Sequence, residues 1–360
     1  MKTAIFLGAG ASASEGAPIQ NKLFRDYFKI CKAAGNYGYT EMERKLATFF
    51  MLMFDIDVDH GNLDNIVFPT FEEALGILDL AEIRNESFRE FSNLNIASNS
   101  GQLKFMRLYL TLLMAKTIHE KLISTKKIHS KLVKNLKNKN KLQDVFFLST
   151  NYDILIDNAL TSLYPEISLD YGVDFANFNE PNDWTKPSND GVKLFKIHGS
   201  LNWLYCPTCN NLRLTPKEKG VIKLLAEDSY LSNQVFCKKC ETIYSPIIVP
   251  PTFYKDFTNV FLNLVWNKAE QSLLEAKHVI FCGYSFPDAD MHIKYLIKRV
   301  QKNRRGETPL RISIINNHKG KKKSIKDEEK GRYERFLGNS VNYTKLSFEQ
   351  FAERPELLIN

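Results

Sequence analysis

Long hydrophobic runs are absent from this sequence. No stretch of 18 or more consecutive apolar residues occurs, which is the length expected of a membrane-spanning helix. The composition is otherwise ordinary for a globular protein, with 44% hydrophobic and 25% charged residues in a chain of 360. We therefore expect no membrane segment, and enough chain to bury the core of one large domain or two smaller ones.

Acidic residues are fewer than basic ones, because 41 Asp and Glu stand against 49 Lys and Arg, which leaves a net charge of +8. Such an excess can mark a surface for nucleic acid or another anionic ligand. Much of it lies in two lysine-rich stretches, 126–141 and 319–323, and neither is interleaved with the aromatic residues on which bases stack. We interpret the excess as a lysine-rich composition and keep nucleic-acid binding as the alternative.

Cysteine is sparse, and four of the six cysteines form two CxxC pairs: Cys206, Cys209, Cys237 and Cys240. In an intracellular enzyme this spacing indicates a tetrahedral four-cysteine zinc site rather than disulfides, with redox-active thiols as the alternative. We expect a small zinc-ribbon module over residues 201–244, which metal binding would stabilise because the segment is too small to form its own core. The remaining two, Cys31 and Cys282, lie in apolar surroundings and are expected to be buried packing residues.

The N-terminus has only a superficial likeness to a signal peptide. Lys2 precedes a short apolar stretch that ends in small residues, but Gly8 and Gly10 interrupt it. We interpret residues 3–7 as a buried first strand, followed by a small-residue turn and a helix over residues 21–33, in a cytoplasmic protein.

This order of strand, turn and helix is typical of the first βα unit of a dinucleotide-binding fold. Small residues let the backbone approach a pyrophosphate, which the N–H groups of the helix N-terminus can hold. The turn does not have the Gly-x-Gly-x-x-Gly pattern, and glycine turns after a first strand are common. The pattern alone is therefore weak evidence for nucleotide binding.

Residues from about 40 to 142 are predicted to be helical. Thr70 and Glu73 form a capping box that opens one helix, and residues 103–123 have the apolar spacing of another. No chemical motif and no repeat occurs there, so we expect a helical insertion over residues 40–142 that serves as a lid or a partner surface. Two of its histidines, His119 and His129, are expected on helix surfaces.

Further buried strands are predicted at five places, and most of them end in polar or small residues. They cover residues 144–149, 194–197, 278–283, 310–315 and 341–346, and residues 247–250 are expected to return the chain to the same sheet. Ligands of open α/β sheets gather at the carboxyl ends of the strands. The residues that follow these strands are therefore candidates for a site: Asn151, Asp153, His198, Gly283, Ser285 and Asn316.

Each of these residues also has an ordinary structural explanation. Asp153 can cap the helix predicted from residue 154 onward. His198, which enters a Gly-Ser turn, can be a core histidine that bonds the backbone. The stretch 318–334, rich in lysine and mixed in charge, is expected to be a solvated loop or an exposed helix.

Six of these features stand in one order that resembles the sirtuin superfamily, and specifically its divergent bacterial branch found in antiphage defence. The resemblance spans residues 3–317 apart from the helical insertion, and implies one sirtuin-like domain over residues 1–360. Its fold would be α/β, a doubly wound Rossmann-like parallel sheet with the helical insertion and the four-cysteine zinc ribbon. The features are Gly8-Ala9-Gly10-Ala11-Ser12, Asn151-Tyr152-Asp153, His198-Gly199-Ser200, the two CxxC pairs, Gly283-Tyr284-Ser285 and Asn316.

The resemblance implies NAD as the bound nucleotide and a structural Zn²⁺ that is remote from the chemistry. His198 would act as the base near the ribose hydroxyls, and Asn151 and Asp153 would face the nicotinamide ribose and its carboxamide. The residues that would hold the pyrophosphate are Gly8, Ala9, Gly10 and Ser12. Those that would hold the adenosine half are Gly283, Ser285 and Asn316.

Two departures from the family pattern bear on the substrate. Protein-deacylating sirtuins follow the glycine loop with a Phe-Arg pair after the proline, whereas Ile19 and Gln20 follow Pro18 here. They also carry a hydrophobic-Phe-Gly-Glu strand that docks the acyl-lysine peptide, whereas residues 247–253 here read Ile-Ile-Val-Pro-Pro-Thr-Phe. Both departures count against a peptide substrate and favour water as the acceptor.

The function that these observations predict is NAD glycohydrolysis, with nicotinamide and ADP-ribose as products, in a defence effector that depletes NAD. Such an activity needs gating, so we expect a homo-oligomer and an activating protein partner, for example a DNA-translocating ATPase or another nucleic-acid-handling protein. One alternative is an NAD-dependent protein deacylase or ADP-ribosyltransferase. Another is a non-enzymatic zinc-ribbon protein that senses a nucleotide and binds nucleic acid.

Overall fold

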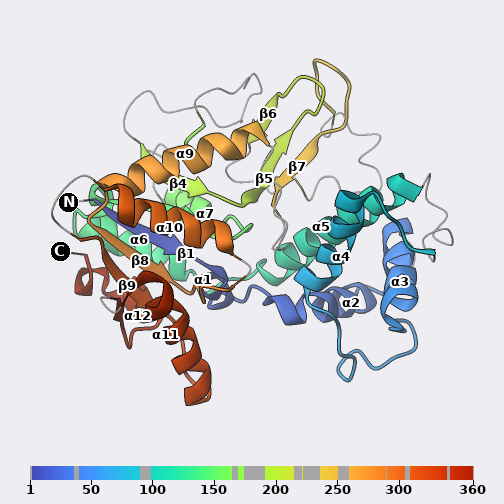
Figure 1. Cartoon of the computed structure of the whole chain (residues 1–360), viewed down its shortest axis with the longest axis horizontal. Coiled ribbons are helices and arrows are strands. Elements are labelled where there is room, and N and C mark those ends of the chain that lie inside the picture. Colours follow the sequence, from blue (N-terminus) through green and yellow to red (C-terminus); the bar gives the residue numbers. More distant parts are fainter. Residues whose placement is uncertain are drawn as a thin grey trace.

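Seven parallel strands form the central sheet, in the order β10-β9-β8-β1-β2-β4-β3 (Figure 1). The computed structural model describes residues 2–35, 40–89, 99–163, 169–173, 191–214, 221, 236–249, 259–288, 290–304, 309–338 and 341–359. The strands are β1 (Thr3–Leu7), β2 (Val145–Ser149), β3 (Leu169–Asp170), β4 (Val192–Lys196), β8 (His278–Cys282), β9 (Arg311–Ile315) and β10 (Asn342–Tyr343).

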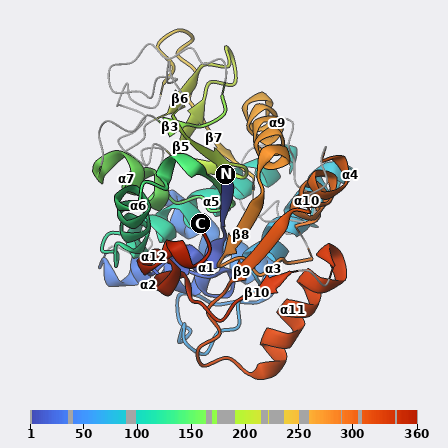
Figure 2. The ribbon, with the colours of Figure 1, turned by 90° about the vertical axis from the view of Figure 1, so that its left-hand side faces the viewer.

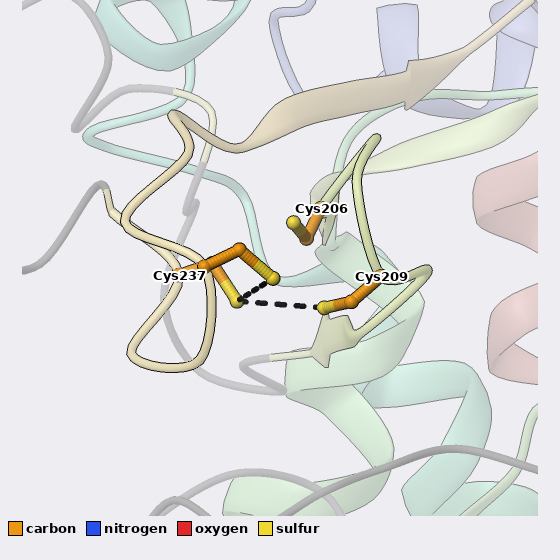
Figure 3. A group of neighbouring side chains, drawn as sticks. Cys206, Cys209 and Cys237 are labelled. Atoms are coloured by element: carbon orange, nitrogen blue, oxygen red, sulfur yellow. Dashed lines mark hydrogen bonds between the residues drawn. The ribbon is translucent and has the colours of Figure 1, made fainter.

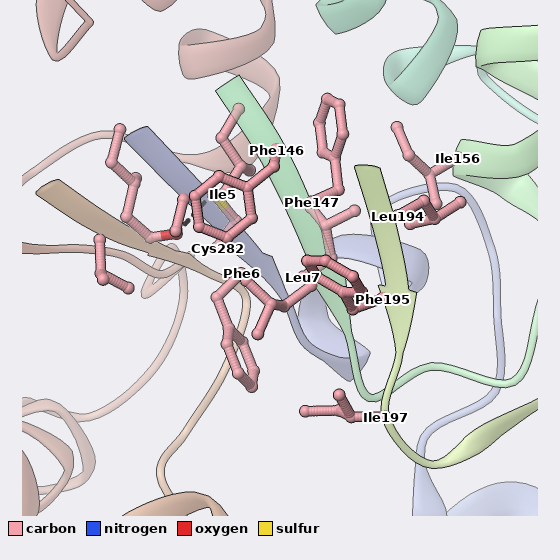
Figure 4. Packing of buried hydrophobic residues seen from close by; sticks show 14 of the residues in the cluster. Ile5, Phe6, Leu7, Phe146, Phe147, Ile156, Leu194, Phe195, Ile197 and Cys282 are labelled. Carbon is pink, nitrogen blue, oxygen red and sulfur yellow. Dashed lines mark hydrogen bonds between the residues drawn. The ribbon is translucent and has the colours of Figure 1, made fainter. Parts of the chain in front are cut away.

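The central strands are apolar along their whole length because helices cover both faces of the sheet. All five residues of β1 are buried, as are all five of β2 and of β8. A strand of a parallel sheet that is buried on both faces reads as a continuous hydrophobic run rather than an alternating one. Figure 4 labels Phe6 of β1, Phe147 of β2 and Phe195 of β4, which all belong to one buried hydrophobic cluster.

The helices divide between the two faces of the sheet (Figure 2). One face carries α6 (Ile128–Asn138), α7 (Leu155–Leu163) and α12 (Phe348–Glu353), and α6 contacts both of the others. The opposite face carries α9 (Val260–Glu275), α10 (Met291–Asn303) and α11 (Lys323–Leu337). Short 3₁₀ turns lie at η1 (Gln20–Lys22), η3 (Leu142–Asp144) and η5 (Pro355–Leu357).

The strand order reverses at β1, which is paired with β2 on one side and with β8 on the other. The chain builds the sheet from β1 toward β4 and β3, then crosses back to add β8, β9 and β10. In doubly wound sheets the crevice at such a reversal, outside the carboxyl ends of the strands, is where ligands bind. The residues that follow β1 and β8 therefore lie in the crevice where doubly wound sheets bind their ligands.

A second group of elements lies beside the sheet, at the right and the top of Figure 1. The helices are α2 (Leu23–Ala33), α3 (Glu41–Phe54), α4 (Phe71–Arg84) and α5 (Asn99–Lys121), and the short α1 (Ala9–Ala13) leads into them from β1. Three antiparallel strands accompany them: β5 (Gly199–Tyr205), β6 (Leu212–Leu214) and β7 (Ser245–Ile248). These helices and strands share one hydrophobic cluster, in which Leu46 and Leu110 join Leu201 and Leu204.

The expected α/β fold with a parallel sheet is confirmed, and so is the capping box of Thr70 and Glu73 at the start of α4. Cys31 and Cys282 are buried, as predicted. No helix in the described residues is long and apolar enough to cross a membrane. The proposed boundaries of a helical insertion at 40–142 and a zinc ribbon at 201–244 stay predictions.

Two expectations are wrong, and a third is confirmed except at two residues. Residues 247–250 are expected to rejoin the parallel sheet, but Ile247 and Ile248 belong to β7, which pairs antiparallel with β5 in the small sheet, and residue 250 lies outside the described residues. His129 is not on a helix surface but 2% exposed, since the Glu15 carboxylate accepts hydrogen bonds from its backbone N–H and its Nδ1. The stretch 318–334 contains most of α11, a mostly exposed helix as expected, except that Glu329 and Tyr333 are buried.

Candidate functional site

The glycines of the first turn pack against the turn that follows β8. The backbone N–H of Gly8 donates to the carbonyl of Cys282 (2.9 Å), and that of Gly10 donates to the carbonyl of Gly283 (2.7 Å). A Cβ atom added to Gly8 or Gly10 would lie 2.7–2.8 Å from atoms of residues 283 and 284. Gly283 has φ +62°, and a Cβ there would meet Ala11 N at 2.1 Å. Only residues without a side chain allow this contact at the reversal of the sheet.

Ser12, Asn151 and Asp153 form one buried hydrogen-bond network. Ser12 Oγ donates to Asp153 Oδ2 (2.6 Å), and Asn151 Nδ2 donates to Ser12 Oγ (2.8 Å) and to the Gly8 carbonyl (2.9 Å). These bonds fix the orientation of the Asn151 amide and leave its Oδ1 as the remaining acceptor. Asp153 also accepts from the N–H of Leu155 (3.0 Å), so it both caps α7 and contacts the glycine turn.

His198 lies between the two sheets, at the point where β4 ends and β5 begins, and is 3% exposed. Its carbonyl accepts a hydrogen bond from the N–H of Val249 (2.9 Å), and Tyr152 OH donates to the Val249 carbonyl (2.7 Å). Gly199 follows with φ +80°, where a Cβ would lie 2.0 Å from the Ile247 carbonyl oxygen. The glycine after the histidine is thus required for β5 to pass close to β7.

Asn316 lies at the carboxyl end of β9, beside the turn that follows β8. Its Nδ2 donates to the carbonyl of Tyr284 (2.9 Å) and to Glu329 Oε1. Glu329, on α11, is 4% exposed and also accepts from Tyr343 OH (2.6 Å). Ser285 is exposed, and its carbonyl accepts from Arg332 Nε (3.2 Å). A buried carboxylate therefore stands next to the residue predicted to hold adenosine.

One cavity of about 610 Å³ joins all of these groups. Its size is within the range of small-molecule sites. Of the predicted nucleotide and catalytic residues, Gly8 is the exception that does not line it, since it lies behind the turn and accepts the Asn151 bond. The predicted residues that line it are Ala9, Gly10, Ser12, Asn151, Asp153, His198, Gly283, Ser285 and Asn316.

The helical group contributes an apolar part of the same cavity. The contributing side chains come from α2, α4 and α5 and include Leu23, Phe71, Met114 and Ile118. The helical group thus supplies apolar walls to the space at the carboxyl ends of the strands.

The four cysteines of the CxxC pairs converge at one end of the small sheet, where β5 ends and β6 and β7 begin, and Figure 3 labels three of them. All four Sγ atoms lie within 4.8 Å of one another, with 3.6 Å between Cys209 and Cys237 and 4.0 Å between Cys237 and Cys240. A tetrahedral ion with Zn–S bonds of about 2.3 Å places its sulfurs roughly 3.8 Å apart. The cluster therefore fits zinc. Burial opposes ionisation of Cys237, but hydrogen bonds from the N–H groups of Lys239 and Cys240 lower its pKa to about 7.

A comparison with family models gives a match to the SIR2-like domain over residues 145–337, more than half of the chain. The chain belongs to the SIR2-like family. Curated protein sequences give no match. The match covers Asn151, His198, the four cysteines, Gly283 and Asn316, whereas the first glycine turn precedes it.

Solved sirtuin structures are similar to this SIR2-like chain at low sequence identity. A Sir2 in complex with the inhibitor EX-527, 2'-O-acetyl-ADP-ribose and a deacetylated p53 peptide is 15% identical over 100% of this chain and 95% of that chain, with a TM-score of 0.40. Sir2Tm bound to a propionylated peptide is 13% identical over 100% and 94%, with a TM-score of 0.42. A complex of Sir2, a p53 peptide and NAD⁺ is 14% identical over 98% and 91%, with a TM-score of 0.42.

Membership of the SIR2-like family fits an NAD-utilising enzyme. The structure also shows two groups that the sequence analysis does not single out: Glu329, which lines the cavity, and Lys196, which is buried and does not line it. Glu329 was missed because it falls in a lysine-rich stretch that looks solvated. Lys196 carried a signal, since a lysine stands inside an otherwise apolar run two residues before His198.

Proposed function

We propose that the chain is an NAD glycohydrolase that cleaves NAD to nicotinamide and ADP-ribose. The observation that carries the proposal is that His198, the Ser12–Asn151–Asp153 network and the Gly10–Gly283 turn line one cavity at the reversal of the sheet. The cavity thus has polar side chains at one end, where the reacting ribose would lie, and a glycine turn at the other, where the backbone can approach a pyrophosphate. Zn²⁺ would be held by the four cysteines, where it would stabilise the small sheet without an open position for chemistry.

The reaction breaks the bond between nicotinamide nitrogen and ribose C1', and the bonding electrons leave with neutral nicotinamide. A water oxygen then bonds to C1' and gives up a proton, which neutral His198 can accept near neutral pH. Asn151 Oδ1 is the acceptor left free by the bonds of its amide nitrogen, so it can orient that water. Burial of the site by the helical group would shield the oxocarbenium-like centre until the water arrives.

Water is favoured over a peptide acceptor by the segment after β7. Deacylating members of the family dock a peptide strand near this segment, but here both backbone groups of Val249 are bonded within the chain, to His198 and Tyr152. Ile247 and Val249 are each 2% exposed. Together with the absence of the Phe-Gly-Glu pattern, this supports hydrolysis.

The test is nicotinamide release from NAD by the purified chain with no peptide present. His198→Ala and Asn151→Ala should each reduce release by roughly 10²–10⁴-fold, the usual cost of losing a positioned base or its partner. His60→Ala is the matched control, because His60 is exposed and lies outside the cavity. Release that appears only when an acylated peptide is added would show the deacylase alternative instead.

We further propose that the activity is gated and serves bacterial antiphage defence by depleting NAD in the cytoplasm. Unregulated NAD hydrolysis would harm the cell, which favours a homo-oligomer or an activating protein partner, such as a DNA-translocating ATPase or another nucleic-acid-handling protein. Light scattering of the intact chain, with nicotinamide release measured on each species, tests this. Full activity of a monomer without any partner would contradict gating. Unchanged NAD with excess protein, partner and nucleic acid would favour a nucleotide sensor.

A further inference from the structure

A charged pair is enclosed beneath the candidate site. Lys196, the last residue of β4, and Asp157, in the first turn of α7, are both 0% exposed, and Lys196 Nζ lies 3.5 Å from Asp157 Oδ2. Tyr171 OH donates to the other oxygen of that carboxylate, Asp157 Oδ1, at 2.6 Å. Neither Lys196 nor Asp157 lines the cavity.

Stability does not explain this pair. Two buried charges lose their hydration, and replacing such a pair with apolar side chains is often neutral or stabilising. The ammonium also lies at the N-terminus of α7, where the helix dipole disfavours a positive charge. The neighbouring strand residues Leu194 and Phe195 are buried and apolar, so an apolar residue at position 196 would suit the surroundings. A specific contact must therefore account for the lysine.

That contact is to the segment that carries Asn151 and Asp153. Lys196 Nζ donates to the main-chain carbonyl of Asp153, while the side chain of Asp153 accepts from Ser12 Oγ on the cavity side. The same strand delivers His198 two residues later. One ammonium group thus joins the strand that leads to His198 with the connection between β2 and α7.

We propose that Lys196 and Asp157 are positioning residues for the reaction. Lys196 fixes the position of the Asp153 backbone relative to β4 through its hydrogen bond to the Asp153 carbonyl. Asp157, in the first turn of α7, neutralises and orients the ammonium. Together they set the spacing between His198 and Asn151. This inference rests on the proposed glycohydrolase activity, which supplies one readout. The second readout, the rate of amide hydrogen exchange in residues 150–155, does not depend on activity.

The experiment compares the wild type with the double variant Lys196→Met/Asp157→Asn. Removing only one charge would leave the other buried alone and would destabilise the chain strongly, whereas the double variant is neutral and keeps an acceptor for Tyr171. A matched control is Arg107→Met/Asp79→Asn, which removes a 2.6 Å pair between α5 and α4 that does not line the cavity. Thermal unfolding verifies folding, amide hydrogen exchange reports on residues 150–155, and nicotinamide release gives kcat and KM.

The folded double variant should show faster exchange in residues 150–155 and a kcat lower by about 10²-fold, the effect of a displacement of about 1 Å at a reacting centre. Its affinity for AMP, which would occupy only the adenosine end beside Asn316, should remain within about twofold, because that end is untouched. Wild-type exchange and kcat in the folded double variant would overturn the inference. If the wild type itself releases no nicotinamide, the proposed function fails, and the exchange comparison alone decides whether the pair holds this segment.

Discussion

Ser12 Oγ donates a 2.6 Å hydrogen bond to Asp153 Oδ2, and both residues are buried, at 2% and 5% exposed. The two are far apart in sequence, since Ser12 follows β1 and Asp153 follows β2. The bond joins the glycine turn, where a pyrophosphate would lie, to the residues that would face the nicotinamide ribose. It therefore couples the two ends of the cavity through a single hydroxyl group.

Replacing Ser12 with alanine should impair catalysis more than folding. Asp153 would lose one of its two side-chain bonds and Asn151 one of the two acceptors of its Nδ2, which costs about 1–3 kcal/mol in a buried network. We expect nicotinamide release to fall by roughly 10-fold or more, since the amide of Asn151 is no longer held. Ser272→Ala, on α9 outside the cavity, is the control. Equal rates for Ser12→Ala and the wild type would remove Ser12 from the site.

Glu329 should discriminate between NAD and NADP. Its carboxylate is 4% exposed, lines the cavity beside Asn316 and would lie near the adenosine ribose, where it can accept from a 2'-hydroxyl but repels a 2'-phosphate. We expect ADP-ribose to bind at least about 10-fold more tightly than its 2'-phosphate, and Glu329→Gln to narrow that ratio. Calorimetry measures both affinities. Glu334→Gln, on the same helix, is the control, and an unchanged ratio in Glu329→Gln would place the adenosine elsewhere.

The strands could be predicted from sequence, and the contacts between distant side chains could not. Buried parallel strands are apolar throughout, so residues 3–7 and 278–282 stand out, and polar residues after them point to the cavity. The prediction that residues 247–250 join the parallel sheet is wrong, because hydrophobicity does not say which neighbour a strand pairs with. His129 looked like a surface residue until Glu15 supplied its partner. Such pairs depend on the packing of whole elements.

The four-cysteine cluster should bind one zinc ion per chain, and its loss should loosen the small sheet. Structural zinc contributes directly to folding, because the ligands of a small module have little other support. Replacing Cys206 and Cys237 with serine should abolish zinc binding and lower Tm by about 5 °C or more, a loss of a few kcal/mol. Metal content is measured by atomic absorption. Cys282→Ala, a buried cysteine outside the cluster, should keep its zinc, and a zinc-free wild type with the same Tm would contradict a structural role.

His278 should make the chain sensitive to acid. It begins β8, is 3% exposed and bonds Ser313 Oγ through Nε2 (2.9 Å). Burial lowers its pKa to about 4, and the positive charge of Arg311 acts in the same direction. In the unfolded chain the pKa of His278 is near 6.5. Between about pH 6.5 and pH 4 its imidazole is therefore protonated in the unfolded chain but neutral in the folded chain. The stability linked to neutral His278 is therefore complete above that window and lost as the pH falls through it.

A glutamine at position 278 isolates this effect. It can still bond Ser313 but takes up no proton, so His278→Gln should lose less stability than the wild type between pH 7.5 and pH 4.5, by at most about 3 kcal/mol. Urea unfolding measures the free energy of unfolding of each protein at both pH values. Comparing the two pH-dependent losses cancels the contribution of the carboxylates, because both proteins share them. His60→Gln serves as the control because the side chain of His60 is 89% exposed and should not change the profile. Parallel profiles for all three proteins would show that protonation of His278 costs the folded state nothing, and that β8 tolerates a charge at its buried end.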